Sequence, residues 1–208
     1  QQHSITEGDT SLWEEARAAL QPLLTLQRDA EETAKQLAAC NDPAEGRRLA
    51  ARYDHLQQEL HRQDAYNLDH KVERVLSGLG FAKNSFASAV TSLSGGEQNR
   101  LMLAKLLLAE PDAMLLDEPS NHLDIEGTEW LEEFLASSTA AMIVVSHDRY
   151  FLDKVTNHTL ELFHGTVDRY SGNFSAYWRQ KAERLLVERR TYEKQQTEIE
   201  KMKEFIRR

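Results

Sequence analysis

The chain has 208 residues, of which 40% are hydrophobic and 28% charged, a composition typical of one sizeable globular domain with an appendage. A single cysteine, Cys40, excludes an intramolecular disulfide and a multi-cysteine zinc site. No apolar run approaches the roughly 20 residues that a membrane span needs, so we expect a cytoplasmic protein with no membrane contact. The sequence opens on Gln1 rather than methionine and stops at Arg208 within a helical pattern, so we also expect a piece of a longer protein.

The net charge of −9 is unevenly distributed along the chain. Residues 175–208 carry ten Lys and Arg against six Glu, a net charge of +4, which leaves −13 for the residues before them. The acidic body argues against a general nucleic-acid groove, whereas the basic tail suits a phosphate-rich partner. The alternative interpretation of the tail is a solvated helix whose mixed charges pair at i, i+4 spacing.

The first predicted elements are two helices that form an antiparallel hairpin. Apolar residues recur at helical spacing from Leu12 to about Ala39, and this run ends in CNDPAEG. A second helix begins there, with Asp42 as N-cap, Pro43 at the first helical position and Glu45 completing a capping box. Because the outer faces are highly charged, we expect the hairpin to project into solvent or against a partner.

Two further helices flank a loop that contains glycine. The first is expected from about Leu68 to Leu79, with Gly78 and Gly80 as candidates for its C-cap. The second follows SLSGGEQNR, residues 92–100. It is apolar nearly all round, and such a helix is expected to be buried.

The stretch SLSGGEQNR has two interpretations. Ser94 and Glu97 fit a capping box, in which case the glycines form only a turn. Alternatively, Gly95 and Gly96 let backbone N–H groups approach an anion at the positive end of the following helix. The stretch alone does not decide between a cap and a phosphate site.

The segments AMLLDEP (113–119), GTEWLEEFLASS (127–138) and AMIVVSHD (141–148) have the pattern of strand, helix and strand. Such an alternation predicts a parallel α/β sheet with buried strands. A helix near 148–155, a hairpin around the dipeptide His-Gly and a long polar helix to the end of the chain follow.

Polar residues follow both predicted strands. Since ligands meet the carboxyl ends of parallel strands, we expect Asp117, Glu118 and His147 to lie side by side. One carboxylate could reach a metal and the other a water, a division that suits phosphoryl transfer with Mg²⁺. Taken singly, the acids could form a turn or an N-cap, and the histidine could belong to a loop.

The motifs LSGGE (93–97), LLDEPSNHLD (115–124) and SHD (146–148), in this order, resemble the signature, the Walker B motif with its following loop, and the switch histidine of an ATP-binding cassette ATPase. The resemblance implies an α/β fold of the P-loop nucleotidase type, with a parallel sheet, a helical subdomain, a helical-hairpin arm and a long linker helix. It also implies two cassettes paired head to tail, with two ATP molecules between them and Mg²⁺ as cofactor.

The resemblance assigns nucleotide-binding roles to residues of the signature and of the loop after Walker B. Ser94, Gly95 and Gly96 would hold the γ-phosphate of the ATP carried by the opposite cassette, and Glu97 belongs to the same nucleotide-binding motif. Asp124 would bridge the interface between the two cassettes.

The catalytic roles fall on the strand ends. By the same resemblance, Asp117 would support Mg²⁺, Glu118 would act as general base and His147 would contact the γ-phosphate. Gln2, in preference to Gln1, resembles the glutamine that senses Mg²⁺ and the attacking water.

The phosphate loop of the family has no counterpart in these 208 residues. The dipeptide Gly-Lys occurs nowhere, so the motif G-x-x-x-x-G-K-[ST] is absent. In the family this loop lies upstream of the glutamine, hence before Gln1. We therefore predict that the chain alone neither binds ATP tightly nor hydrolyses it.

Four segments resemble the ABC-F branch of the family: NHLD (121–124), SHDRYFLD (146–153), YSGNFSAYW (170–178) and residues 188–208. This branch implies two cassettes in one chain, joined by a helical linker and acting on the ribosome as a translation factor or an antibiotic-resistance (ribosome-protection) protein. The implied partners are the second cassette of the same parent chain, the ribosome and tRNA, with rRNA contacts through the arm and the linker.

The resemblance also predicts the domain boundaries. Residues 1–172 would form the latter part of a first cassette, and 173–208 would begin the linker. Within the cassette we expect the arm hairpin at about 12–63, the signature helix at 93–109 and the Walker B strand at 113–118. The alternatives are the ATPase subunit of a membrane transporter and an interaction module whose cassette is inert.

Overall fold

A computed structural model describes residues 10–207. The chain divides into two compact units, and the boundary between them passes through two strands and one helix. Of the described residues, the first unit comprises 10–114, Pro119–Leu131 and Thr139–Met142, and the second comprises Leu115–Glu118, Glu132–Ser138 and 143–207.

The first unit begins with two helices where a single one was expected. Helix α1 spans Leu12–Ala18, and helix α2 spans Gln21–Ala39. Pro22 lies in the first turn of α2, where its missing N–H costs nothing. In a continuous helix its ring would clash with the carbonyl of Ala18, so the prediction of one helix from Leu12 was wrong for a steric reason.

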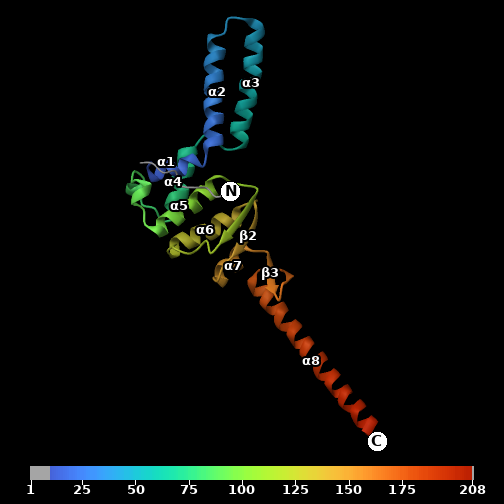
Figure 1. Cartoon of the computed structure of the whole chain (residues 1–208). Coiled ribbons are helices and arrows are strands. Elements are labelled where there is room, and N and C mark those ends of the chain that lie inside the picture. The colour runs from blue at the N-terminus through green and yellow to red at the C-terminus, as the bar shows by residue number, and fades with distance from the viewer. Residues whose placement is uncertain (1–9, 208) are drawn as a thin grey trace. The chain divides into compact units, whose positions relative to one another are not determined.

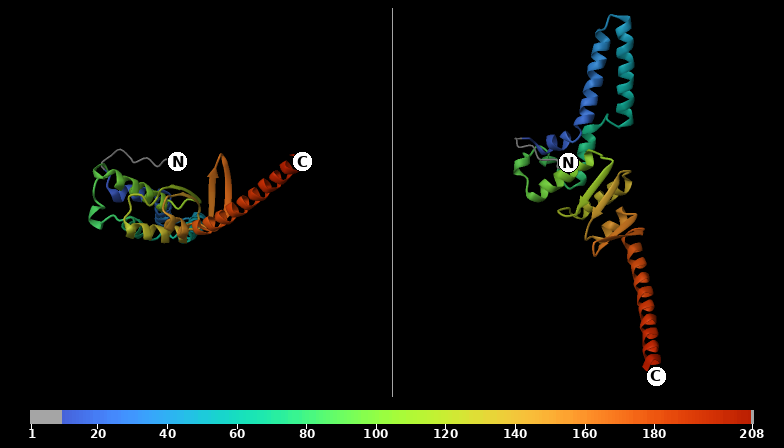
Figure 2. Two further views of the ribbon diagram at one scale, coloured as in Figure 1. Left: turned by 90° about the horizontal axis from the view of Figure 1, so that it is seen from below. Right: turned by 45° about the vertical axis from the view of Figure 1, so that its right-hand side comes forward.

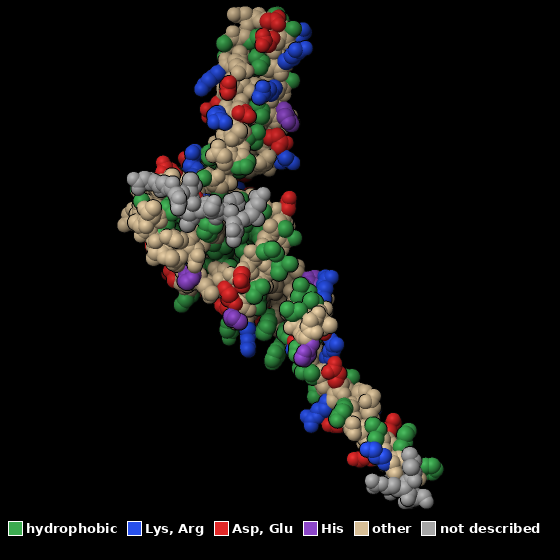
Figure 3. Space-filling model, in the orientation of Figure 1, with side chains coloured by type: hydrophobic (Ala, Val, Ile, Leu, Met, Phe, Trp, Pro, Cys, Tyr) green, Lys and Arg blue, Asp and Glu red, His purple; other side chains and the backbone are tan. Residues whose placement is uncertain are grey.

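Helix α2 and helix α3 (Pro43–Arg62) form the predicted antiparallel hairpin and lie side by side in Figure 1 and in the right-hand view of Figure 2. Asp42 caps α3, accepting hydrogen bonds from the N–H groups of Ala44 and Glu45, each at 3.2 Å. Acidic and basic side chains are interspersed over the face of the hairpin that Figure 3 shows.

The core of the first unit lies between α1, α4 (Leu68–Gly78) and α5 (Gly95–Leu108). None of residues 101–108 is exposed, which confirms the expectation of a buried helix. Two 3₁₀ turns, Lys83–Ser85 and Val90–Ser92, connect α4 to α5. The largest fully buried side chains of this core are Leu12, Leu20, Val72, Leu76, Leu79, Leu101, Leu107 and Leu108.

Strands β1 (Ala113–Asp117) and β2 (Ala141–Val145) pair with each other. The Ala141 N–H donates to the Asp112 carbonyl at 2.9 Å, and the Glu118 N–H donates to the Val145 carbonyl at 2.8 Å. The starts of the two strands lie side by side, and so do their ends. The strands are therefore parallel, as predicted. Helix α6 (Ile125–Ser137) connects them.

The expectation that these strands are buried on both faces was wrong. Met114 and Leu116 of β1 are buried, but Leu115 between them is 78% exposed. On β2, Ile143 and Val145 are more than half exposed. Parallel strands normally carry helices on both faces, and the described residues cover only one face of this pair.

The second unit continues with α7 (Arg149–Val155), strands β3 (His158–Phe163) and β4 (Thr166–Ser171), and α8 (Phe174–Arg207). The two strands form the predicted antiparallel hairpin, and its turn at His164 and Gly165 has positive φ angles of 47° and 77°. Helix α8 is the long polar helix predicted from the sequence (Figure 1). None of the helices formed by residues 10–207 combines the length and apolar character that a bilayer crossing requires.

Candidate functional site

The start of α5 is closed by a reciprocal pair of hydrogen bonds. The Ser94 Oγ accepts from the Glu97 N–H at 3.4 Å, and Glu97 Oε2 accepts from the Ser94 N–H at 2.8 Å and from the Ser94 hydroxyl at 2.6 Å. These bonds from Ser94, the hydroxyl first, lower the pKa of the Glu97 carboxyl below 4.5. The predicted capping box is therefore confirmed.

The two glycines after Ser94 leave backbone donors and space. Among the described residues, no acceptor meets the N–H of Gly95 or Gly96. A Cβ added at Gly95 would meet no atom within 4 Å, so packing within the described chain does not require a glycine there. A Cβ at Gly96 would lie 3.5 Å from His122, an ordinary contact. These two N–H groups can therefore donate hydrogen bonds to an acceptor that is not part of the described chain.

Arg100, one turn further along α5, fixes this helix to the end of α4. Its guanidinium donates to the carbonyl of Leu79 at 3.1 Å and stacks 4.8 Å above the Phe81 ring. Gly80 between them has a φ of +80°, a conformation that glycine adopts without strain. Arg100 therefore fixes the first turns of α5 to the end of α4.

Glu118 and His147 meet at the carboxyl ends of β1 and β2. Glu118 Oε1 lies 3.4 Å from His147 Nε2, and Glu118 Oε2 accepts from the His147 N–H at 3.3 Å. The Ser146 hydroxyl also donates to Oε2, at 3.4 Å. The Glu118 side chain is 23% exposed and the His147 side chain 99% exposed, so a shielded carboxylate lies beside an imidazole open to solvent.

The backbone of Glu118 is strained. Its φ is +47°, in the left-handed region that non-glycine residues rarely occupy. Such a conformation costs roughly 1–3 kcal/mol and is found mostly where a side chain must be aimed. Here it turns Glu118 away from the strand direction that Asp117 follows.

Asp117 is the last residue of β1, and its side chain is exposed. Within residues 10–207, no group of three or more His, Cys, Asp or Glu residues is arranged to hold a metal. Mg²⁺, however, commonly takes one or two protein carboxylates together with phosphate oxygens and water. A single exposed carboxylate at a strand end fits that coordination.

Asp124 lies at the start of α6 and acts as its N-cap. Asp124 Oδ1 accepts from the Gly127 N–H at 2.7 Å, and the Asp124 carbonyl accepts from the Thr128 N–H at 2.9 Å. These contacts lie at the start of α6, so a role for Asp124 between two cassettes stays a prediction. Gln2 and Gln1 lie outside the described residues.

Sequence reasoning missed two sets of contacts. Lys105 is buried in α5 and forms an ion pair with the equally buried Glu15 of α1. A lone lysine in an otherwise apolar helix was the available signal. Asp153 of α7 binds Ser175 at the start of α8. No periodicity in the sequence points to that contact.

Comparisons with known proteins identify the family of the chain. Residues 5–121, more than half of the chain, match the family model described as ABC transporter, and residues 160–208 match a second model with the same description. The chain belongs to the ATP-binding cassette (ABC) family. Its curated relatives include members of the ABC-F branch, which confirms the resemblance drawn from the motifs.

Three of the curated relatives come from different organisms and match the chain to different extents. The chain is 46% identical to YdiF of Bacillus subtilis over 168 residues, 81% of this chain and 26% of the relative. It is 46% identical over 152 residues to the energy-dependent translational throttle protein EttA of Mycobacterium tuberculosis, covering 73% and 27% of the two chains. It is 39% identical over 161 residues to ABC transporter F family member 5 of Arabidopsis thaliana, covering 77% and 23%. The ABC chain thus spans about a quarter of the length of these relatives.

One solved structure supports the fold. The ATP-binding subunit of an ABC transporter superposes with a TM-score of 0.52 at 17% identity, over 90% of this chain and 65% of that chain. At that identity the likeness concerns the fold alone, and it agrees with the predicted α/β class.

Proposed function

We propose that the longer protein containing this ABC chain binds and hydrolyses ATP through two paired cassettes and acts on the ribosome in translation. The observation that carries the enzymatic part is the meeting of Glu118 and His147 at the ends of two parallel strands. The translational part is supported by the name of the relative EttA and by the other ABC-F relatives.

Glu118 is the proposed general base. Its carboxylate is mostly shielded, is held by the His147 N–H and the Ser146 hydroxyl, and can accept a proton from a water molecule beside it. General-base catalysis contributes roughly 10²–10⁴ to the rate, so this one carboxylate can determine whether ATP is hydrolysed. His147, with its ring open to solvent, can donate a hydrogen bond to the γ-phosphate.

Asp117 is the residue that would hold Mg²⁺. The ion would neutralise the charge of the β- and γ-phosphates during transfer. The carboxylate of Asp117 is exposed at the strand end, whereas that of Glu118 is mostly shielded beside His147. The two acids can therefore serve the metal and the water separately.

The start of α5 would contact a second ATP molecule. Free N–H groups at Gly95 and Gly96, together with the positive end of α5, suit a γ-phosphate carried by the opposite cassette. The Ser94 hydroxyl and Glu97 lie at the same helix end, and Asp124 would lie at the interface. Each ATP site would then need both cassettes.

The 208 residues alone would be inactive. They contain no G-x-x-x-x-G-K-[ST] motif, whose backbone and lysine hold the phosphates in this class of enzyme. We infer that the exposed apolar face formed by Leu115, Ile143 and Val145 is covered, in the longer protein, by the part that supplies this loop.

The arm and the tail would make the ribosomal contacts, in the cytoplasm. The hairpin α2–α3 would correspond to the arm, and α8, with ten Lys and Arg in residues 175–208, to the start of the linker near tRNA. Pairs such as Arg189 with Glu193, at 3.0 Å, also support the interpretation of α8 as a solvated helix. A housekeeping role and a ribosome-protection role are both compatible with these features.

Co-sedimentation with ribosomes tests the proposal. Glu118→Gln removes the base but preserves shape, so the full-length variant should bind ATP, stay closed and pellet with ribosomes only when ATP is present. Glu133→Gln, at an exposed position of α6, is the matched control and should behave like the wild type. ATP-driven pairing without ribosome association would contradict the translational role and favour a transporter subunit.

A further inference from the structure

Helix α7 begins two residues after His147, at Arg149. Asp148 caps it, with Oδ1 accepting from the N–H groups of Tyr150 at 2.9 Å and Phe151 at 3.1 Å. The Phe151 side chain is completely buried and anchors the helix. His147 is therefore joined to α7 by the single residue that caps this helix.

The other end of α7 binds the first turn of α8. The carboxylate of Asp153 accepts from the Ser175 N–H at 2.6 Å and also from the Ser175 hydroxyl. The Asp153 carbonyl accepts from the Asn173 side-chain amide at 3.2 Å, while the Asn173 Oδ1 caps α8 at the Ala176 N–H, at 3.1 Å. One residue of α7 thus makes three hydrogen bonds to the start of α8, and those to a carboxylate are the stronger kind.

A second contact joins the two helices at their first residues. The guanidinium of Arg149 lies 5.7 Å from the centre of the Phe174 ring, within the range of a cation–π interaction. Both ends of α7 therefore contact α8, and a rotation between the two helices would break several interactions at once.

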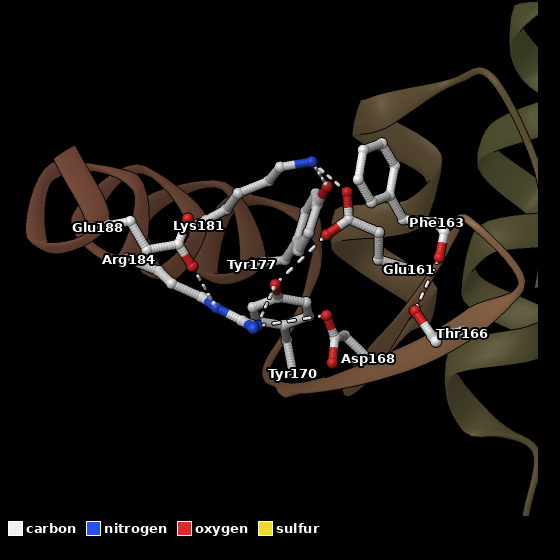
Figure 4. Close-up of polar contacts among 9 residues, drawn as sticks. All are labelled: Glu161, Phe163, Thr166, Asp168, Tyr170, Tyr177, Lys181, Arg184 and Glu188. Atoms are coloured by element: carbon white, nitrogen blue, oxygen red, sulfur yellow. Dashed lines mark hydrogen bonds and ion pairs between the residues drawn. The ribbon is translucent and has the colours of Figure 1, made fainter. Parts of the chain in front are cut away.

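The hairpin β3–β4 holds the next turns of α8 (Figure 4). Lys181 forms an ion pair with Glu161, and Arg184 binds Asp168 at 3.2 Å and the Tyr170 hydroxyl at 3.4 Å. The Tyr170 and Tyr177 rings pack edge to face, 4.9 Å between centres. The bond to Glu161 raises the pKa of Lys181 to about 12, so this ion pair persists at neutral pH.

The rest of α8 has no such support among the described residues. From Glu188 onward, its side-chain hydrogen bonds join residues of α8 itself, such as Arg189 with Glu193 and Thr191 with the Val187 carbonyl. The direction of the whole helix is consequently fixed within its first turns.

We propose that α7 and the first turns of α8 form one rigid connection, through which the position of His147 sets the direction of α8, and that Asp153 is its positioning residue. The inference rests on the proposed function, because the movement it transmits is the closure of the cassettes on ATP. Asp153 touches neither ATP nor the reacting atoms in this scheme. A purely capping role for Asp153 is the alternative.

Two readouts in the full-length protein separate the alternatives. ATP turnover reports the chemistry, and ATP-dependent co-sedimentation with ribosomes, measured with Glu118→Gln also present, reports the placement of α8. For Asp153→Ala we expect turnover close to that of the wild type and ribosome association weakened about tenfold or more, since couplings between sites typically change affinity by about 5- to 150-fold.

Further variants distinguish the loss of the contact between α7 and α8 from a general loss of folding. Ser175→Ala removes one of the three hydrogen bonds and should give a smaller loss, whereas Ser175→Thr keeps the hydroxyl and should restore association. Glu133→Gln, at an exposed position of α6, is the matched control and should change neither readout.

Three results would count against the connection. Unchanged ribosome association in Asp153→Ala would overturn it. Equal losses of turnover and association in both Asp153→Ala and Ser175→Ala would show a structural role only. If the wild type itself neither turned over ATP nor associated with ribosomes, the proposed function would fail, and the connection with it.

Discussion

Helices α1 and α5 begin with the same cap but differ in what surrounds it. In both, a serine and a glutamate three residues later exchange hydrogen bonds: Ser11 with Glu14, and Ser94 with Glu97. At α1 the next two N–H groups, of Leu12 and Trp13, donate to loop carbonyls at 2.9 and 3.0 Å. At α5 the corresponding groups belong to glycines and, within the described residues, meet no acceptor.

This difference separates a structural cap from a candidate phosphate site. The capping box satisfies the local backbone in either place and therefore carries no functional information by itself. Free donors, a missing side chain and open space distinguish α5. The serine–glutamate spacing visible in the sequence is shared by both helices, whereas the occupancy of the N–H groups is visible only in the structure.

The largest expected difference between the two caps concerns activity. In the full-length protein, Ser94→Ala should lower the rate of ATP hydrolysis about 10²- to 10³-fold, the usual loss when one donor to a developing charge is removed. Ser11→Ala should leave the rate unchanged. Steady-state turnover of the two variants measures this contrast, and equal rates would remove the functional distinction between the caps.

A smaller effect, expected to be similar for both, concerns stability. Replacing an N-cap serine with alanine typically lowers the free energy of unfolding by about 1 kcal/mol. Ser11→Ala and Ser94→Ala should each show a loss of this size in urea unfolding of the full-length protein. A loss confined to Ser11→Ala would mean that Ser94 does not cap α5 in solution.

The smallest effect is a change in the pH dependence of stability. Hydrogen bonds from the cap serines lower the pKa of Glu14, chiefly through the Ser11 backbone, and of Glu97, chiefly through the Ser94 hydroxyl, below 4.5. A lowered folded-state pKa stabilises the protein above the unfolded pKa, and this contribution is lost as the pH falls through the folded value. Ser94→Ala removes the chief cause of the lowered Glu97 pKa and should therefore differ less from the wild type at pH 3 than at pH 6. Ser11→Ala keeps the backbone bond to Glu14 and should show a smaller change of the same sign. Unfolding curves at the two pH values test the sign.

Much of the molecule could be predicted because its signals are local. The caps at Asp42 and Ser94, the hairpin turn at Gly165 and the parallel strand pair all follow from short patterns. Glu118 and His147 could be placed together because parallel strands end at one edge.

One local signal was overlooked, and other features could not be predicted because they depend on packing between distant segments. The break before Pro22 was visible in the sequence, but the apolar periodicity obscured it. The exposed face of β1 depends on what covers Leu115, and the bond between Asp153 and Ser175 depends on how α7 meets α8. Periodicity carries no information on either.

Glu118 is the proposed base of an ATPase whose phosphate loop must come from outside these 208 residues. The most direct test is ATP turnover by the full-length protein, by its Glu118→Gln variant and by the 208-residue chain alone. We expect turnover by the first, a rate about 10²- to 10⁴-fold lower for the second, and none for the third. Wild-type turnover by Glu118→Gln, or hydrolysis by the chain alone, would contradict the account.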